Sequence, residues 1–262
     1  MVDKDGLVKP VLLIILEELY CSGIEEICLI VSREDKKSIE AVFDNELSDE
    51  HRHKISPAML QYENKIRKIG GMITFAYQNE RLGFGHAVYQ SMTFSNNEPV
   101  LLVLGDHLFS STSDKTCAAQ AIEAFDQHGG ELTVMICEIP VSQASNYGVV
   151  SGSWLDHNEN LLQTNDIVEK PTPEYARENL SVSMKDGGEK VFSLFGQYVL
   201  TPDVYRILGR NINKGKTENG EYQLTSALKE VMRTKGMLGF VPNGKRYDTG
   251  NPSAYMQTIR YF

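Results

Sequence analysis

Short apolar runs alternate with helix-like stretches along the first half of this chain, and this alternation constrains the fold more than any other feature. Residues 27–31 form an unbroken apolar run, Ile-Cys-Leu-Ile-Val, which is typical of a strand covered on both faces. Further strands are predicted at 73–77, 100–104 and 132–136. Helices are predicted at 10–21, 34–43, 86–92 and 116–128. Such βαβ repetition predicts an α/β fold with a doubly wound, mostly parallel sheet.

The second half of the chain is less regular. Residues 192–200 and 237–241 are strand-like, and residues 223–233 are helical. Residues 45–70 are polar and charged without being rich in Gly, Ser or Pro, so they indicate an insertion, helical at 58–69, rather than a linker. No boundary divides the sequence, and we expect a single domain over residues 1–262.

The composition is that of a soluble globular protein, with 41% hydrophobic and 23% charged residues among 262. The net charge of −9 argues against nucleic acid or an anionic membrane as a partner. The longest apolar run, residues 11–16, is far shorter than the roughly 20 residues of a membrane span. The four cysteines are scattered without a CxxC pair, so we interpret them as reduced core residues of a cytoplasmic protein. The sequence does not indicate the oligomeric state, and a homo-oligomer is possible.

Gly105 and Asp106 follow directly on the strand-like run at 100–104. Ligands of open α/β sheets bind beyond the carboxyl ends of strands, where Gly105 permits a turn and close approach to the backbone. Asp106 is therefore a natural ligand for magnesium, although a turn or helix-capping aspartate would give the same pattern.

Five short motifs arrive in a fixed order: Gly-Phe-Gly-His-Ala-Val at 83–88, Leu-Val-Leu-Gly-Asp at 102–106, Asn-Tyr-Gly-Val-Val at 146–150, Val-Glu-Lys-Pro at 168–171 and Tyr-Asp-Thr-Gly at 247–250. Together they resemble the sugar-1-phosphate nucleotidyltransferases, and among these the bacterial enzymes that use UTP and glucose 1-phosphate. The resemblance implies a nucleotide-diphospho-sugar transferase fold. It also implies magnesium-dependent transfer of a uridylyl group to glucose 1-phosphate, giving UDP-glucose and pyrophosphate.

The resemblance implies a nucleotide and metal half of the site. Asp106 and Asp248 match the two carboxylates that hold one magnesium ion in the family, and Gly105 precedes the first of them. Gln78 matches the glutamine that pairs with the base, and its amide can donate and accept at once, as a uracil edge requires. Gly83 matches the glycine that lets the backbone approach that base. His86 begins a helix and is not expected to be catalytic, and the spread histidines offer no metal-ligand spacing.

The resemblance also implies a sugar-phosphate half of the site. Gly148 matches the glycine whose amide contacts the sugar, and Glu169 matches the carboxylate on the sugar hydroxyls. Lys170 matches the lysine on the sugar phosphate, a role suited to a compact point charge. Glu221 is a further candidate for a hydroxyl contact, whereas Thr225 is left outside the site as a capping residue.

One family feature is missing from this sequence. The family begins with a strand and a Gly-x-Gly-Thr-Arg loop whose amides cradle the nucleotide phosphates. Residues 1–9 contain one glycine, and neither Lys4 nor Lys9 is a convincing substitute for the family's phosphate-binding lysine. We therefore expect the first strand to be absent and turnover to be slow. Three alternatives stay open: a truncated enzyme, a non-catalytic sugar-nucleotide binding or regulatory protein, and an enzyme with another loop. The identity of the sugar and of the base also stays open.

Overall fold

The computed structural model describes residues 1–44, 48, 50, 53–155, 157 and 159–262. Its strands are β1 (Ile27–Val31), β2 (Ile73–Tyr77), β3 (Val100–Val103), β4 (His107–Ser111), β5 (Thr133–Ile139), β6 (Gly148–Trp154), β7 (Leu161–Glu169), β8 (Val182–Ser183), β9 (Glu189–Leu200), β10 (Leu238–Phe240) and β11 (Gly244–Asp248). Its helices are α1 (Val11–Cys21), α2 (Lys36–Asp44), α4 (Pro57–Gly71), α5 (Phe84–Tyr89), α6 (Met92–Ser95), α7 (Cys117–Gln127), α8 (Pro173–Asn179), α9 (Pro202–Asn213), α10 (Leu224–Lys235) and α11 (Pro252–Tyr261), with a 3-10 turn η1 at Val141–Asn146.

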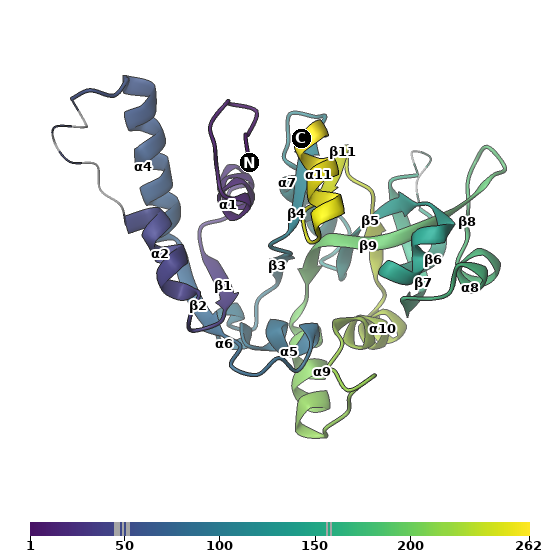
Figure 1. Ribbon diagram of the computed structural model, residues 1–262. Helices are drawn as coiled ribbons and strands as arrows, with labels where there is room; N and C mark the ends of the chain where they lie inside the picture. The colour runs from purple at the N-terminus through teal and green to yellow at the C-terminus, as the bar shows by residue number, and fades with distance from the viewer. Residues whose placement is uncertain (45–47, 49, 51–52, 156, 158) are drawn as a thin grey trace.

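The main sheet has the strand order β3-β9-β5-β10-β7-β6, with β8 attached to β9 (Figure 1). The α/β class is confirmed, but the sheet is mixed rather than mostly parallel. The twelve-residue strand β9 runs antiparallel to β3, β5 and β6, and within this sheet the parallel pair among the described strands is β5 with β10. An apolar run shows that a strand is buried but not which way it runs, which is why the sequence did not predict this orientation.

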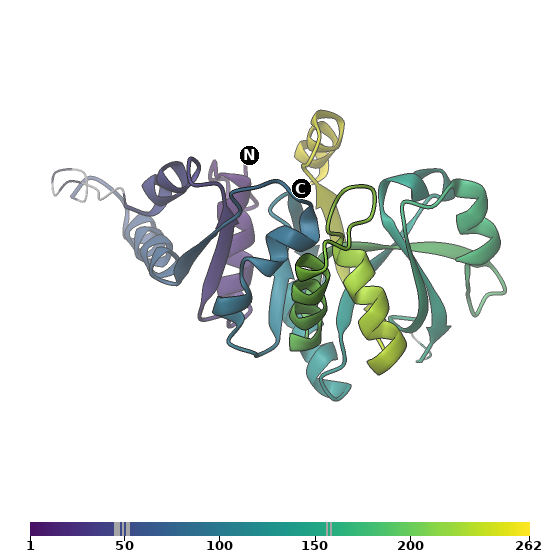
Figure 2. The ribbon, with the colours of Figure 1, turned by 90° about the horizontal axis from the view of Figure 1, so that it is seen from below.

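Helices cover both faces of the main sheet, as expected for a doubly wound fold. On one face α5, α9 and α10 lie side by side (Figure 2). Their residues Val204, Leu208 and Leu228 are buried against sheet residues such as Leu200. On the other face α7 packs its alanines and Phe125 against β5 and β10. These two layers hold the strands whose ends carry the predicted site residues.

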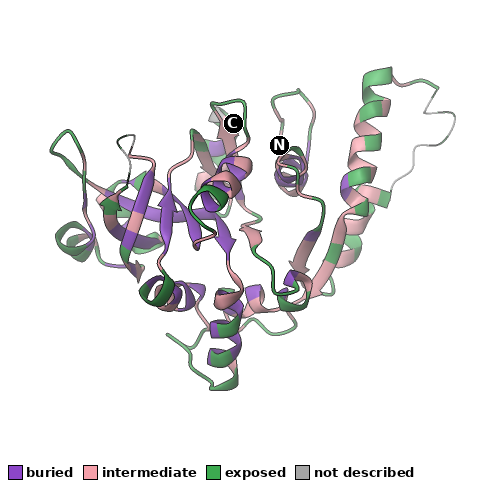
Figure 3. Cartoon of the chain, turned by 180° about the vertical axis from the view of Figure 1, so that it is seen from behind, coloured by how far each residue is buried: buried purple, intermediate pink, exposed green. Residues whose placement is uncertain are grey.

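The parallel pair β1 and β2 packs with α1, α2 and α4, and their core cluster also takes in Leu108 of β4 and Ala118 of α7. The expected helix at 58–69 is present as α4, which begins after the cap Ser56, whose hydroxyl accepts a hydrogen bond from the Met59 amide at 3.3 Å. Residues 45–47, 49, 51 and 52 of the expected insertion lie outside the described residues. Figure 3 shows the main sheet largely buried, whereas α2 has no buried residue and α4 has only Ile69.

A groove with a cavity volume of about 840 Å³ separates β1 from β3. Among the described strands β1 pairs only with β2, and β3 pairs only with β9, so each has an unpaired edge. All residues of both strands line the groove, together with apolar side chains of α1 and Phe84 and Phe94 from α5 and α6. The expected absence of a first strand stays a prediction.

The four cysteines are free thiols, and no described helix is long and apolar enough to cross a membrane. Cys117 is buried, and burial raises its pKa to about 12. Cys21 is exposed at the end of α1, so the expectation that all four belong to the core is wrong for this residue.

Candidate functional site

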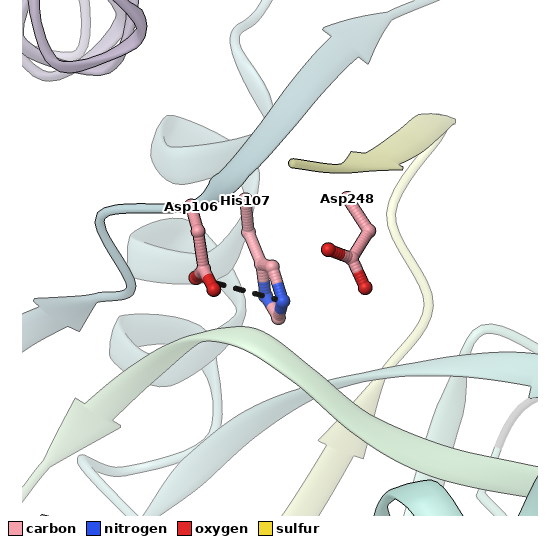
Figure 4. A group of neighbouring side chains, drawn as sticks. All are labelled: Asp106, His107 and Asp248. Carbon is pink, nitrogen blue, oxygen red and sulfur yellow. Dashed lines mark ion pairs between the residues drawn. The ribbon is translucent and has the colours of Figure 1, made fainter. Parts of the chain in front are cut away.

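Two strand ends bring Asp106 and Asp248 together. Strand β4 pairs antiparallel with β11, and their register places His107 opposite Asp248. The loop after β11 closes the arrangement, because the amide and the hydroxyl of Thr249 each donate to the Asp106 carbonyl at 2.8 Å. One donor atom from each of Asp106, His107 and Asp248 lies within 4.8 Å of the other two (Figure 4). The predicted convergence of the two carboxylates is therefore present in the fold.

Gly250 follows Asp248 and lies close to both carboxylates. The Gly250 amide donates to the Asp248 carboxylate at 2.7 Å. A Cβ on Gly250 would lie 2.4 Å from an oxygen of the Asp106 carboxylate, so a larger residue there would displace that carboxylate. Gly105 lies in the turn between β3 and β4, as predicted, although its φ is not positive and a Cβ there would meet no atom within 4 Å. The open space beside Gly105 remains available to a ligand.

His107 is a site residue that the sequence analysis missed. Its ring is buried and stacks on Phe195 with the centroids 4.0 Å apart and the planes at 4°. Its Nε2 atom lies 3.8 Å from an Asp106 carboxylate oxygen. Burial lowers the pKa of His107, although Asp106 and Asp248 oppose that shift. The spacing of the histidines gave no signal because the pairing of β4 with β11, and not sequence distance, creates this cluster.

The predicted sugar-phosphate residues also meet, at the ends of β6 and β7. These strands pair with Gly148 opposite Glu169. A Cβ on Gly148 would lie 3.2 Å from the Glu169 carboxylate, so the glycine makes room for that side chain. Thr225, which the sequence analysis left outside the site, donates its hydroxyl to Glu169 at 2.6 Å. Glu169 is thus fixed between a strand end and the first turn of α10.

Lys170 follows β7 in an uncommon backbone conformation. Its φ of 48° lies in the left-handed region, which residues other than glycine and asparagine rarely adopt. Its amide donates to the Tyr147 carbonyl at 3.0 Å, which holds the turn beside Gly148. The side chain is exposed, and its ammonium group has no ion-pair partner in the part of the chain that the structure describes. This charge is free to contact a ligand.

Gln78 and Gly83 meet in the loop after β2. The Gln78 side-chain amide donates to the Gly83 carbonyl at 3.2 Å and lies 3.2 Å from the His86 ring. Gly83 has a φ of 107°, and a Cβ there would lie 2.8 Å from the Cβ of Glu221. Glycine is therefore required for packing against the loop at Glu221, whereas the sequence analysis assigned it to approach of a base. Base contact by Gln78 and Gly83 stays a prediction.

Glu221, the further candidate for a sugar hydroxyl, lies in the loop before α10. It packs against Gly83, and its carboxylate accepts a hydrogen bond from Gln223 at 2.9 Å. It therefore lies beside Gly83, and four residues further along the chain Thr225 contacts Glu169. The expected contact of Glu221 with a sugar hydroxyl stays a prediction.

A cavity of about 760 Å³, lined mostly by polar residues, extends from Asp248 to the turn before β6, where Tyr147 lines it. Arg246 lines it too, with its guanidinium carbon 3.7 Å from the centre of the Phe195 ring. Its buried Nη1 has no hydrogen-bond partner among the described residues. No role was predicted for Arg246 from the sequence. At the other side, Gln78 and Gly105 line the groove between β1 and β3.

The chain is similar to a family of known proteins and to individual members of it. The family described as nucleotidyl transferase matches residues 5–261. The UTP–glucose-1-phosphate uridylyltransferase of Pseudomonas aeruginosa is 30% identical over 256 residues, which cover 97% of this chain and 84% of that protein. UTP–glucose-1-phosphate uridylyltransferase 2 of Streptococcus pyogenes is 32% identical over 255 residues, with 95% and 78% covered.

Solved structures agree with the fold. A UDP-glucose pyrophosphorylase complexed with UDP-glucose gives a TM-score of 0.78 at 27% identity, covering 96% of this chain and 86% of that one. A UTP-bound UGPase from Acinetobacter baumannii gives a TM-score of 0.74 at 21% identity, with 97% and 82% covered, and supports the fold alone.

Proposed function

The chain belongs to the nucleotidyl transferase family, and on this premise we propose that it transfers a uridylyl group from UTP to glucose 1-phosphate, with release of pyrophosphate. The relatives named UTP–glucose-1-phosphate uridylyltransferase support the choice of both substrates. The observation that carries the proposal is the approach of Asp106 to Asp248 beside a cavity lined mostly by polar residues.

The reaction needs positioning more than proton transfer. A phosphate oxygen of glucose 1-phosphate attacks the α-phosphorus of UTP and forms the new P–O bond. The bond between the α-phosphorus and the bridging oxygen breaks, and pyrophosphate leaves with its electron pair. The attacking oxygen is largely ionised near neutral pH, because such phosphates have a second pKa of about 6. No general base is required, and catalysis rests on holding the groups in line.

The chain's residues fit a divalent cation. Asp106 and Asp248 offer carboxylate oxygens, which suit Mg²⁺, and the Asp106 side chain is half exposed and open to a ligand. When bound there, Mg²⁺ would neutralise charge on the phosphates. Asp106 and Asp248 would hold the ion, and Gly250 keeps the space between them open.

The sugar phosphate is proposed to lie beside Glu169 and Lys170. Lys170 has an exposed ammonium group at the end of β7, which suits a phosphate. Glu169 is oriented by Thr225, so its remaining oxygen can accept a hydrogen bond from a sugar hydroxyl. Gln78 and Gly83 are proposed for the base.

Pyrophosphate release from UTP and glucose 1-phosphate tests the proposal directly. Matched reactions replace UTP with TTP, or glucose 1-phosphate with its mannose and galactose counterparts. The expected result is Mg²⁺-dependent release with the first pair and a loss of release in Asp106→Asn and Asp248→Asn. Faster release with another pair would overturn the choice of substrates, and release that survives both substitutions would overturn the assigned site.

A second candidate is a protein that binds sugar nucleotides without turnover, and the engagement of Lys9 favours it. The Lys9 ammonium group is buried and lies within 2.7 Å of carboxylate oxygens of Asp3, Asp5 and Glu17, so it is not available to a phosphate. Binding of UDP-glucose in calorimetry together with no pyrophosphate release would select this candidate. For either function we propose a cytoplasmic protein, in keeping with its free thiols.

A further inference from the structure

We propose that His107 is a third donor of the metal site at Asp106 and Asp248, and that its nitrogen biases the site toward a first-row transition ion such as Mn²⁺ over Mg²⁺. The inference rests on the metal site of the proposed function and adds to it a ligand and a metal preference.

The three donor side chains lie close enough together to share one ion. Figure 4 shows the side chains reaching the same side of the β4 and β11 ends, with the imidazole between the two carboxylates. Their donor atoms lie within 4.8 Å of one another. Donors about 2.1 Å from one octahedral ion are separated by about 3 to 4.2 Å, so small side-chain rotations complete the site.

The ring nitrogens of His107 lack hydrogen-bond partners among the described residues. The ring is buried, with 8% of the residue exposed. Its Nδ1 has no partner among the described residues, and its Nε2 is 3.8 Å from Asp106, which is too far for a hydrogen bond. Nε2 therefore makes no hydrogen bond to the described part of the chain and faces the carboxylates, so it is free to bind a metal ion, whereas the unpartnered Nδ1 lies on the other side of the ring.

The ring is also held in the required orientation. Its stacking on Phe195 fixes the plane of the imidazole. Gly196 has a φ of 72° and closes the Nδ1 side, where a Cβ would lie 2.8 Å from that nitrogen. Nδ1 is therefore turned toward the protein backbone, and Nε2 is turned toward the carboxylates.

The chemistry of the donor set gives the metal preference. Carboxylate oxygens suit Mg²⁺ and Mn²⁺ alike, whereas an imidazole nitrogen adds affinity for transition ions and little for Mg²⁺. Two carboxylates with one imidazole thus form a site in which the ratio of Mn²⁺ to Mg²⁺ affinity depends on His107.

The test measures metal binding to the full chain without nucleotide. Dissociation constants for Mn²⁺ and Mg²⁺ are determined for the wild type, for His107→Phe, which keeps the stack on Phe195, and for His128→Gln as a control. His128 lies at the end of α7 and is bonded to the Ala124 carbonyl, away from the site. We expect His107→Phe to weaken Mn²⁺ by about tenfold or more and Mg²⁺ by less than about threefold, and the control to change neither. Pulsed EPR of bound Mn²⁺ should show nitrogen coupling that is lost in His107→Phe.

Each outcome decides the proposal. Equal weakening of both ions, unchanged Mn²⁺ binding or the absence of nitrogen coupling in the wild type would overturn it. If His107→Phe does not fold, His107→Asn is measured, with the same expected loss of nitrogen coupling. Metal binding that is unchanged in Asp106→Asn and Asp248→Asn would instead reject the metal site of the proposed function, so the two failures are distinguishable.

Discussion

The hydroxyl of Thr225 donates a 2.6 Å hydrogen bond to the carboxylate of Glu169. This contact joins the first turn of α10 to the end of β7 across 56 residues of sequence. It fixes one oxygen of Glu169 and leaves the other to a ligand, so the orientation of the proposed sugar contact depends on a residue of another element.

Thr225→Ala should therefore weaken UDP-glucose binding. A hydrogen bond to a charged group contributes about 1.5–3 kcal/mol, and part of that should appear as lost ligand affinity. Thr225→Ser keeps the hydroxyl and should bind nearly as well as the wild type. Thr234→Ala is the matched control in α10, because the partners of its hydroxyl among the described residues are carbonyls of its own helix. Calorimetry with UDP-glucose measures all three, and equal effects of Ala and Ser at position 225 would contradict the role of the hydroxyl.

Asp106→Asn and Asp248→Asn should each weaken Mg²⁺-dependent UTP binding, and the double mutant should be little worse than either single mutant. Residues that hold one ion act as a unit, so their effects are not additive. Titration calorimetry with UTP, with and without Mg²⁺, provides the measurement. Fully additive losses would mean that the two carboxylates do not share an ion.

Lys170→Ala should weaken glucose 1-phosphate far more than free glucose. The exposed ammonium group is expected to contact the phosphate, and its loss should cost about 1.5–3 kcal/mol of binding free energy. Lys170→Arg keeps the charge and should retain part of the affinity. Similar losses for both ligands in a competition assay would place Lys170 away from the phosphate.

Gly250→Ala should reduce metal affinity without unfolding the chain. The new methyl group would lie 2.4 Å from the Asp106 carboxylate and would push it away from Asp248. Displacement of a ligand by its surroundings typically changes metal affinity by about 10–100-fold. Gly71→Ala is the control, because a Cβ there meets nothing within 4 Å. Mn²⁺ titration and thermal melting of both variants give the result, and unchanged metal binding in Gly250→Ala would show that the carboxylate does not need this space.

The sequence predicted the parts of this molecule that depend on local patterns. Strands 27–31 and 73–77 are confirmed residue for residue, because short runs rich in β-branched and aromatic residues, each followed by a polar residue, favour strands. The convergence of Asp106 with Asp248 is also present, although a shared ion stays a prediction. What local patterns did not predict is pairing. Strand β11 has the sequence Gly-Lys-Arg-Tyr-Asp, which lacks an apolar run, and its register with β4 brings His107 into the site.

Orientation was the other property that local patterns did not predict. Residues 192–200 were expected as a strand, and β9 contains them, but its antiparallel course between β3 and β5 follows from tertiary contacts alone. The role of Gly83 was missed for a related reason, because its packing partner Glu221 lies far along the chain.

The groove between β1 and β3 has a consequence for the rate at which backbone protons exchange with solvent. The Ile27 amide donates to Met72, so alternate amides of β1 face β2 and the intervening ones, at Cys28 and Ile30, face the groove. Deuterium uptake along β1 should therefore rise and fall with a period of two residues, fast at Cys28 and Ile30 and slow at Leu29. Such a pattern is ordinary at the rim of a sheet, but here it would run through apolar surroundings near the middle of the molecule.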